Sequence, residues 1–447
     1  MKVKGEEVSP HPSTEGKGEG EEERIGKAMN FIVIGITDNP NPRFSPEVLE
    51  IIKSGKVFSG GKRHHDIMAS LLPTDALWID ITVPLEDVFE QYRGLSEKTA
   101  EHTLIVFASG DPLFFGFANT LRREFPEATL QVFPTFNSLQ MLAHKLVIPY
   151  HDMRIVSLTG RPWHEFDKAL IERTTKIGVL TDKNHTPAAI AQRMLEYGYD
   201  EYRMHVGTHL GHPELEQTVT LSLEEAKESV FPMPNCVILD GKTAERTSPI
   251  PGNITAEQAK PFGIPDAEFS LLNGREKMIT KMPIRLLTLQ ALELPKHRVF
   301  WDIGFCTGSV SIEAKLQFPH LQIDAFEIRP ECEHIIHENA RRFGVPGIEV
   351  HIGDFMDCCD NIATDRMPDA VFIGGHGGKL KEIMAKVMTI LAPDGVVVMN
   401  SVIAPKVTTD SRQLWDEACQ ELGLRQDPPT RIQLNDNHTI TILRCRK

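Results

Sequence analysis

The sequence predicts an α/β protein built from two different domains. From Phe31 onward, short apolar runs alternate with amphipathic segments of helix length, which is typical of α/β architectures with largely parallel sheets. A segment rich in proline and glycine follows Asp240 and divides this pattern in two. We find no internal repeat that relates the halves. A length of 447 residues fits about two to four domains.

The first half contains five clear strand candidates and helices with recognisable ends. Ser45 can cap a helix that has Pro46 in its first turn. This helix is expected to end near Ile52, and Gly55 follows it. A second helix is expected over residues 187–197. The expected strands are Phe31–Ile36, Leu104–Ala108, Leu130–Phe133, Ile155–Leu158 and Ile177–Thr181.

The second half begins a new α/β pattern after Phe269. Five strand candidates with crossovers precede two strands around the turn at residues 435–438, which is a hairpin signal. This order predicts a doubly wound, Rossmann-like sheet with an antiparallel edge. The expected strands are Val299–Ile303, Gln322–Glu327, Ile348–Ile352, Ala370–Ile373, Val396–Met399, Arg431–Leu434 and Thr439–Arg444.

These patterns predict four consecutive parts of the chain. Residues 1–28 contain no aromatic residue and are rich in Glu, Lys and Gly, so we expect a disordered tail. Met29 directly precedes the first strand and is a candidate for the native start. The remaining parts are an N-terminal domain over 29–240, a linker over 241–262 and a C-terminal domain over 263–447.

Composition excludes several classes of protein. The net charge of −14 and the lack of a basic cluster disfavour nucleic acid as a partner. No run of about 18 apolar residues is present, so no membrane span is expected. The seven cysteines form no C-x-x-C pair, which indicates a reducing compartment, by default the cytoplasm. His205, His209 and His212 are better explained as polar loop residues or substrate contacts than as metal ligands, so no metal is expected.

The segment 299–309 has the form of a strand, a tight glycine turn and a helix start. Glycines in such a turn let the backbone approach a nucleotide-like ligand closely. The dinucleotide pattern G-x-G-x-x-G does not fit, because Cys306 and Ser309 stand where it needs glycine. The spacing D-x-G-x-x-x-G from Asp302 to Gly308 instead resembles the first motif of Rossmann-like S-adenosylmethionine methyltransferases.

Two further positions fall in register with that motif. Glu327 ends the next strand, where a carboxylate can accept hydrogen bonds from both ribose hydroxyls. Gly353 and Asp354 follow the third strand, where such enzymes hold the adenine end. These positions favour S-adenosylmethionine, while NAD or no ligand at all remain the alternatives.

The N-terminal half has two polar turns of its own. Residues 108–116 join a strand to a helix through Ser-Gly-Asp-Pro. Residues 60–65 place Lys62, Arg63 and His64 after a strand-like run. Both segments fit solvated turns, and they fit equally the rim of a pocket that binds a carboxylate-rich substrate through charge-assisted hydrogen bonds.

Both halves contain the motifs of known families. The N-terminal half resembles tetrapyrrole methylases that act at carbon 5 of the precorrin ring, through Gly-Gly-Lys-Arg-His (60–64), Ala-Ser-Gly-Asp-Pro-Leu-Phe-Phe-Gly (108–116), Val-Ser-Leu-Thr-Gly-Arg-Pro (156–162) and Val-Leu-Thr-Asp (179–182). The C-terminal half is similar to the methyltransferases that act at carbon 15 and remove the carbon-12 acetate carboxyl, through Met-Ile-Thr-Lys (278–281), Asp-Ile-Gly-x-x-Thr-Gly-Ser-Val-Ser-Ile-Glu (302–313), Phe-Gly-Val (343–345) and Phe-Ile-Gly-Gly-x-Gly-Gly (372–378). In this order the whole chain resembles the bifunctional, decarboxylating precorrin-6Y methyltransferase family of cobalamin biosynthesis.

The resemblance implies two S-adenosylmethionine sites in each chain, a tetrapyrrole substrate with or without cobalt, and a homo-oligomer. In a two-lobed tetrapyrrole methylase fold, the first cofactor would lie between the lobes and contact Gly35, Ser109, Gly110, Asp111, Leu113 and Ser138. The second cofactor would contact Thr280, Gly304, Phe305, Cys306, Thr307, Gly308, Glu327, Asp354 and Phe355. The candidate substrate contacts are Lys62, Arg63 and His64.

Several positions depart from the family pattern. The first loop, 35–40, keeps only its first glycine, Cys306 replaces the middle glycine of the C-terminal loop, and His376 stands in a turn where a small residue is usual. No catalytic residue is assigned, and His376 and Asp354 are candidate proton donors for decarboxylation. Three other hypotheses remain: an S-adenosylmethionine-dependent RNA methyltransferase, an assembly or carrier protein with one inactive domain, and, least favoured, an NAD dehydrogenase.

Overall fold

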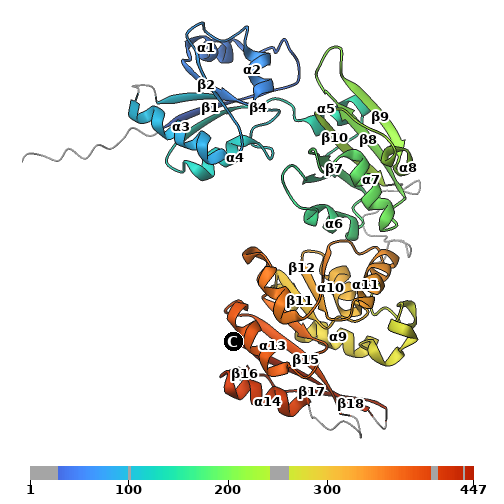
Figure 1. Cartoon of the computed structure of the whole chain (residues 1–447). Coiled ribbons are helices and arrows are strands. Elements are labelled where there is room, and N and C mark those ends of the chain that lie inside the picture. The colour runs from blue at the N-terminus through green and yellow to red at the C-terminus, as the bar shows by residue number, and fades with distance from the viewer. Residues whose placement is uncertain (1–28, 99–101, 242–260, 404–410, 436–437) are drawn as a thin grey trace, which may run out of the picture. The chain divides into compact units, whose positions relative to one another are not determined.

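The computed structural model describes residues 29–98, 102–241, 261–403, 411–435 and 438–447 (Figure 1). The expected tail and most of the expected linker lie outside these described residues. The chain divides into two compact units, Met1–Thr135 and Phe136–Lys447. No helix in the described part of the chain is both long and apolar enough to cross a membrane.

The first unit is a five-stranded parallel sheet in the order β3-β2-β4-β1-β5. Its apolar side chains form one cluster under α1 and α2 and another under α3 and α4, so helices cover both faces (Figure 1). The strands are β1 (Asn30–Ile36), β2 (Val57–Gly60), β3 (Leu77–Asp80), β4 (Thr103–Ser109) and β5 (Thr129–Phe133). The helices are α1 (Pro46–Ser54), α2 (Lys62–Met68), α3 (Leu85–Lys98) and α4 (Phe117–Glu124).

Helix α1 forms as its sequence predicts. The hydroxyl of Ser45 accepts a hydrogen bond from the amide of Val48 at 3.3 Å, which satisfies one of the unpaired donors of the first turn. Pro46 occupies the first turn, and the amide of Gly55 donates to the carbonyl of Ile52 at the other end. The expected cap, first turn and end are confirmed.

The second unit begins with a five-stranded sheet in the order β6-β7-β10-β8-β9, in which only β6 and β7 run parallel. The expectation of largely parallel sheets is wrong here. Eight residues join β8 to β9, and a parallel crossover needs a dozen or more, so these strands form a hairpin. The strands are β6 (Arg154–Ser157), β7 (Lys176–Leu180), β8 (Tyr202–Thr208), β9 (Gln217–Ser222) and β10 (Asn235–Gly241). The helices are α5 (Ser138–Leu146), α6 (His164–Ile171), α7 (Pro187–Glu196) and α8 (Leu223–Lys227).

The C-terminal part of the second unit is the expected doubly wound sheet with an antiparallel edge. Five parallel strands follow the order β13-β12-β11-β14-β15, and β18 then pairs antiparallel with β15 and with β17. The strands are β11 (Val299–Ile303), β12 (Gln322–Glu327), β13 (Ile348–Ile352), β14 (Ala370–Ile373), β15 (Val396–Ile403), β16 (Arg425–Gln426), β17 (Thr430–Asn435) and β18 (His438–Arg446). The helices are α9 (Met282–Ala291), α10 (Ser309–Gln317), α11 (Glu331–Arg342), α12 (Phe355–Cys358), α13 (Leu380–Ile390) and α14 (Ser411–Glu421).

Candidate active sites

The first crevice lies where β1 and β4 end in the first unit. The chain leaves β1 toward one edge of the sheet and leaves β4 toward the other, and ligands bind at such a reversal in open α/β sheets. A Cβ at Gly35 would lie 2.0 Å from the carbonyl oxygen of Gly110 and 2.9 Å from the amide nitrogen of Thr135. Gly110 has φ +63° and donates its amide to the carbonyl of Ile36 at 2.8 Å. Glycine at position 35 therefore lets three backbone segments meet at one point.

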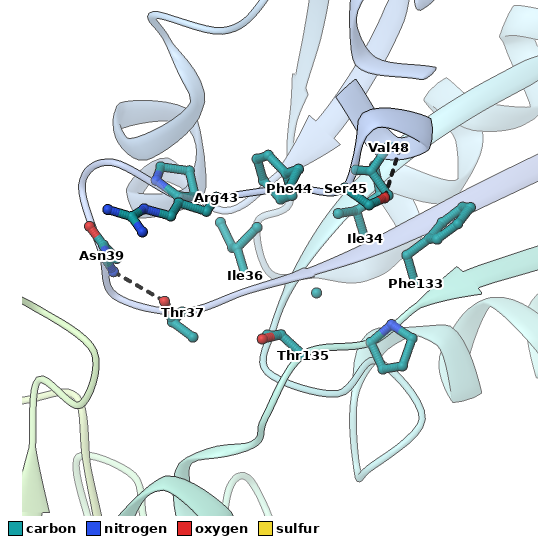
Figure 2. Close-up of a pocket in the computed structure, with 13 residues that line it drawn as sticks. Ile34, Ile36, Thr37, Asn39, Arg43, Phe44, Ser45, Val48, Phe133 and Thr135 are labelled. Carbon is teal, nitrogen blue, oxygen red and sulfur yellow. Dashed lines mark hydrogen bonds between the residues drawn. The ribbon is translucent and has the colours of Figure 1, made fainter. Parts of the chain in front are cut away.

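A cavity of about 410 Å³ opens beside this meeting point (Figure 2). Its wall is formed by the end of β1, the loop into α1 and the residues after β5. It combines an apolar floor with the hydroxyl of Thr37, the amide of Asn39 and the guanidinium of Arg43. The full lining is Ile34, Gly35, Ile36, Thr37, Asn39, Pro42, Arg43, Phe44, Ser45, Val48, Phe133, Pro134 and Thr135.

A chain of polar side chains connects the two turns that the sequence singled out in this unit. Arg63 donates to the carboxylate of Asp38 at 2.7 Å and to the hydroxyl of Ser109 at 2.8 Å. The Nε2 atom of His64 lies 3.0 Å from the same hydroxyl. Burial, with the positive charge of Arg63 added to it, lowers the pKa of His64 to about 4. His64 is therefore a neutral imidazole at pH 7, and Arg63 carries the positive charge of this group.

The remaining predicted residues of the N-terminal half hold the local turns. The carboxylate of Asp111 accepts the amide of Leu113 at 2.9 Å, and the Leu113 side chain is 50% exposed. Lys62 is exposed at the first position of α2. Ser138 is the first residue of α5 in the second unit, where Asn137 caps that helix. Asp38 was not among the expected site residues, because no sequence pattern in its loop indicates that it pairs with Arg63.

The second crevice lies at the carboxyl ends of β11, β12, β13 and β14. Gly304 has φ +79°, and a Cβ there would lie 2.6 Å from the amide nitrogen of Gly375, so the loops after β11 and β14 touch through their backbones. A cavity of about 280 Å³ opens against them. Its lining is Ile303, Gly304, Phe326, Glu327, Ile328, Arg329, Gly353, Asp354, Phe355, Gly375, His376, Gly377, Lys379 and Ile383.

Glu327 is the buried acid of this cavity. Its carboxylate accepts the amide of Cys306 at 3.0 Å and two hydrogen bonds from the Arg329 guanidinium, at 2.9 and 2.7 Å. Burial opposes ionisation, but the hydrogen bonds and charge of Arg329 and the backbone amides hold the pKa of Glu327 below its usual value. Glu327 is therefore a carboxylate that accepts hydrogen bonds at neutral pH. Arg329, two residues further along the chain, was not expected at the site.

Asp354 and His376 lie on opposite loops of the same cavity. One oxygen of Asp354 accepts the amide of Met356 at 3.0 Å, and the other lies 2.5 Å from the amine of Lys379. The hydrogen bond from Lys379 lowers the pKa of Asp354. Burial lowers the pKa of His376, whose Nδ1 accepts the amide of Gly378 at 3.2 Å. At neutral pH the site thus holds an ionised Asp354 and a neutral imidazole.

Five of the expected cofactor contacts in this half do not line the cavity. The side chains of Phe305 and Cys306 pack into a buried cluster with Ile336. The hydroxyl of Thr307 is buried without a hydrogen-bond partner in the described residues, and the carbonyl of Thr280 accepts a hydrogen bond from Arg285 at 2.9 Å. Gly308 is the fifth expected contact that lies outside the lining. The other four expected contacts do line the cavity, namely Gly304, Glu327, Asp354 and Phe355.

Asp302 lies in β11 behind the glycine loop. Its Oδ2 accepts the hydroxyl of Ser311 at 2.6 Å, while its Oδ1 is buried without a partner among the described residues. Burial, opposed only in part by Ser311, raises the pKa of Asp302 to about 7. The first acid of the D-x-G-x-x-x-G motif is therefore a half-protonated group at neutral pH.

The histidines of the second sheet do not assemble into a metal centre in the described residues. His205 is buried in β8, and its Nδ1 pairs with the hydroxyl of Thr220 at 2.7 Å. The Nδ1 of His212 accepts the amides of Glu214 and Leu215 at 3.2 and 3.1 Å. No group of three or more His, Cys, Asp or Glu side chains able to hold a metal ion occurs in the part of the chain that the structure describes.

Two family models match the chain, one in each half. A model described as tetrapyrrole (corrin/porphyrin) methylases matches residues 31–227. A model described as a precorrin methyltransferase domain matches residues 273–439. The second match contains the cavity around Glu327, and the first contains the crevice around Gly35.

Individual relatives agree with these matches. A Sinorhizobium protein named precorrin-6Y C(5,15)-methyltransferase [decarboxylating] is 30% identical over 395 residues, which cover 88% of each chain. A Salmonella typhimurium protein named cobalt-precorrin-6B C(15)-methyltransferase (decarboxylating) is 39% identical over 132 residues, 30% of this chain and 66% of that protein. A solved structure of a Geobacter metallireducens precorrin-6y C5,15-methyltransferase is 31% identical and covers 42% of this chain and 97% of its own, with a TM-score of 0.36. The chain belongs to the family of decarboxylating precorrin-6Y C(5,15)-methyltransferases.

Proposed function

We propose that this chain methylates a precorrin, or its cobalt complex, at carbons 5 and 15 and removes the carboxyl group of the carbon-12 acetate. One observation carries the proposal: two unrelated α/β sheets in a single chain each have a glycine-lined crevice at their strand carboxyl ends. Each crevice lies within a match to a methyltransferase family. We assign carbon 5 to residues 29–240, and carbon 15 with decarboxylation to residues 263–447.

The residues of both crevices fit S-adenosylmethionine, which supplies a sulfonium methyl group to a nucleophilic ring carbon. The cofactor has no phosphate, and in each crevice backbone segments pack closely at a glycine. In the second crevice the Glu327 carboxylate can accept hydrogen bonds from two ribose hydroxyls, and Phe355 offers an apolar surface to the adenine. This fit supports two cofactor sites in each chain.

In the first unit, Arg63 and His64 are suited to hold the substrate rather than to remove a proton. A guanidinium held by Asp38 and Ser109 can bind a ring carboxylate with little loss of side-chain entropy. The neutral imidazole of His64 accepts the amide of Gly61 at Nδ1 and directs its one N–H, at Nε2, to the hydroxyl of Ser109, so it helps to hold this group in place. Positioning of the two reactants supplies most of the rate acceleration in such a transfer, about 7 to 11 kcal/mol.

In the second crevice, His376 is better suited than Asp354 to carry a proton during decarboxylation. Asp354 is held ionised by Lys379 and is already used to cap α12. His376 has a lowered pKa because it is partly buried, and an incoming acetate carboxylate would raise that pKa again. As the carbon–carboxylate bond breaks, its electron pair enters the conjugated ring, carbon dioxide leaves, and an imidazolium at His376 can return a proton to the side-chain carbon.

The mass of the product tests the whole proposal. Purified protein is incubated with S-adenosylmethionine and a precorrin-6Y-type ring, with and without cobalt. A gain of two methyl groups with loss of one carbon dioxide is expected, together with two cofactor molecules bound per chain by calorimetry. A product of unchanged mass with both rings would contradict the proposal. Loss of decarboxylation alone in His376→Asn would support the role given to that imidazole.

The cysteines, one sheet edge and the net charge bear on the compartment and the partners of the protein. All seven cysteines lie in the described residues and are free thiols, which supports a reducing compartment such as the cytoplasm. The edge strand β9 exposes Val219, and an exposed strand edge can pair with a second chain, which supports a homo-oligomer. Light scattering of the purified protein tests the second point. A net charge of −14 disfavours nucleic acid, and the absence of salt-sensitive RNA binding would support this.

A further inference from the structure

Arg329 occupies the acceptor positions of the buried acid in the second crevice. An ionised carboxylate has about four lone-pair sites on its two oxygens. The Oε1 atom of Glu327 accepts the backbone amide of Arg329 at 3.2 Å and its Nε at 2.9 Å. The Oε2 atom accepts the amide of Cys306 at 3.0 Å and Nη2 of Arg329 at 2.7 Å. Four donors therefore fill this carboxylate, and two ribose hydroxyls can bind it only where two of those donors leave.

The four donors differ in how easily they can leave. The two amides belong to backbone beside β12, and the glycine loop is tied to that strand because the amide of Gly304 donates to the carbonyl of Phe326 at 2.7 Å. The Arg329 guanidinium stands at the end of a flexible side chain that is 34% exposed, whereas the Glu327 side chain is 3% exposed. The Nη1 atom of Arg329 lies 3.9 Å from Sδ of Met278, which is a weak acceptor. The guanidinium therefore supplies the two donors that can be exchanged, and the acid stays in place.

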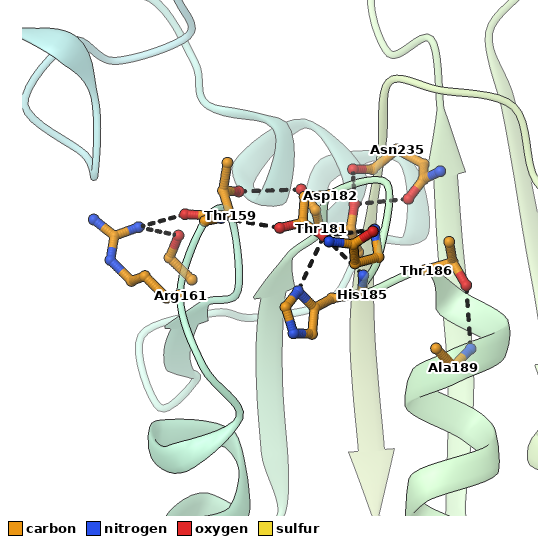
Figure 3. Close-up of polar contacts among 11 residues, drawn as sticks. Thr159, Arg161, Thr181, Asp182, His185, Thr186, Ala189 and Asn235 are labelled. Carbon is orange, nitrogen blue, oxygen red and sulfur yellow. Dashed lines mark hydrogen bonds and ion pairs between the residues drawn. The ribbon is translucent and has the colours of Figure 1, made fainter. Parts of the chain in front are cut away.

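Another carboxylate of the second unit has a different set of donors (Figure 3). Asp182, in the loop after β7, accepts the amides of Gly160, Asn184 and His185 at 2.9, 2.9 and 2.7 Å. It also lies 3.0 Å from the Nδ1 atom of His185. Three of its four donors are backbone amides, and it lines neither of the two crevice cavities. Asp182 is thus a structural tie between loops, whereas half of the donors to Glu327 come from a side chain in a ligand cavity.

We propose that Arg329 competes with the cofactor in the second crevice: its guanidinium holds the two positions on Glu327 that the ribose hydroxyls need, and it turns away when they bind. The inference rests on the proposed function and adds to it a residue that controls access to the carbon-15 cofactor site. A guanidinium and a pair of neighbouring hydroxyls both present two donors to one carboxylate. The apparent affinity for the cofactor is therefore lowered by the fraction of molecules in which Arg329 holds Glu327.

Calorimetry of the full chain with S-adenosylhomocysteine tests the competition without turnover. Arg329→Met is expected to tighten binding at one of the two sites about 3- to 10-fold, because the hydroxyls no longer displace a guanidinium. S-adenosylhomocysteine has no sulfonium charge, so relief of repulsion between two cations does not explain a gain. A titration at about pH 8 keeps Glu327 ionised in the variant. Weaker or unchanged binding by a folded Arg329→Met variant would overturn the inference.

Two controls separate competition for the acid from a change in packing. Arg366→Met is the matched variant, because Arg366 donates from Nε and Nη2 to buried Asp324 on the same strand at 3.1 and 2.9 Å but does not line the cavity. Its affinity for S-adenosylhomocysteine should equal that of the wild type. The 2′,3′-dideoxy analogue of S-adenosylhomocysteine offers no hydroxyl to Glu327, so Arg329→Met should change its affinity less than about twofold. An equal gain for both ligands would show that Arg329 only fills space, and would reject the competition.

A crystal structure with S-adenosylhomocysteine bound tests the displacement directly. The Nε and Nη2 atoms of Arg329 should lie more than about 4 Å from the Glu327 carboxylate, with the two hydroxyls in their place. A guanidinium still paired with Glu327 would overturn the inference. Methyl transfer to carbons 5 and 15 with unchanged binding by Arg329→Met would keep the proposed function and reject the competition. Tighter binding by Arg329→Met without methyl transfer by the wild type would support the competition and reject the proposed function.

Discussion

In both crevices a glycine lets two backbone segments pack closely, although the two sheets have different topologies. In the first unit Gly35 lets the loop after β4 pass against β1, and in the second unit Gly304 lets the loop after β14 pass against β11. The residues that precede these two glycines differ. Two residues before Gly35 stands buried Val33, whereas two residues before Gly304 stands the buried acid Asp302. Close backbone approach is therefore the shared requirement, and a buried acid two residues before the glycine is particular to the second crevice.

Substitution of either glycine should have the largest effect. Gly35→Ala places a Cβ within 2.0 Å of a backbone oxygen, and Gly304→Ala places one within 2.6 Å of a backbone nitrogen at a positive φ. We expect each change to reduce its own methylation about 100-fold, because a displacement of about 1 Å at a reacting centre has that effect. The other methylation should stay within about twofold. Mass spectrometry with labelled S-adenosylmethionine measures both in one reaction.

Two other glycines provide matched controls for this pair. Gly94 in α3 and Gly423, with φ +67°, both have open space where a Cβ would stand. Gly94→Ala should leave both reactions intact, and Gly423→Ala should lower stability slightly without loss of either reaction. If Gly423→Ala abolished carbon-15 methylation, backbone strain rather than close approach would explain the result at Gly304.

Substitution of Glu327, the buried acid of the second crevice, should have the next largest effect. Glu327→Gln keeps the shape of the side chain but removes the charge that Arg329 and the ribose hydroxyls would share. A loss of about 2 kcal/mol in charge-assisted hydrogen bonding predicts a carbon-15 reaction slower by about 10- to 100-fold. Calorimetry should show bound cofactor falling from two molecules per chain to one. Glu331→Gln, on the exposed start of α11, should leave the count at two.

The raised pKa of Asp302 should make the stability of the second unit depend on pH. Because the folded-state pKa of about 7 exceeds the ordinary value of 3.8, folding retains a proton on this group. Its contribution to stability is complete below about pH 4 and is lost as the pH rises through 7. Relative to Asp302→Asn, the free energy of unfolding of the wild type should fall by about 1 to 3 kcal/mol between pH 5 and 7 and change little above that. Urea unfolding of both proteins at several pH values measures the difference, and parallel curves would contradict it.

The sequence predicted those parts of the molecule that local patterns determine. Apolar runs and capping residues located β1, α1, β11 and the terminal hairpin, because strand and helix periods are visible in a short window. The glycine loops were found because a positive φ or a close approach favours a residue without a side chain. Register with the glycine motif located Glu327, and consecutive basic residues marked the polar turn at Arg63.

Side-chain partnerships between distant segments could not be predicted in the same way. Asp38 meets Arg63 across 25 residues of sequence, and Asp182 meets Gly160 across 22 residues. Consecutive residues of a tight turn also point in different directions, so Gly304 reaches the cavity while Phe305 and Cys306 pack into the core. The pairing of β10 with β7 depends on strand order, which alternation alone does not determine.

Substitution of Cys306 should have the smallest effect. It tests whether the second crevice tolerates a cysteine where the family pattern has a glycine. Cys306 has φ +52°, a conformation that costs about 1 to 2 kcal/mol for a residue with a Cβ. Its thiol is buried among Phe305, Cys332 and Ile336, and this packing offsets much of the strain. Cys306→Gly relieves the strain and removes the packing, so we expect a change in stability within about 1 kcal/mol and carbon-15 methylation within about threefold of the wild type. A large gain in methylation would show that the cysteine, rather than the glycines on either side of it, limits the close approach of backbone and cofactor.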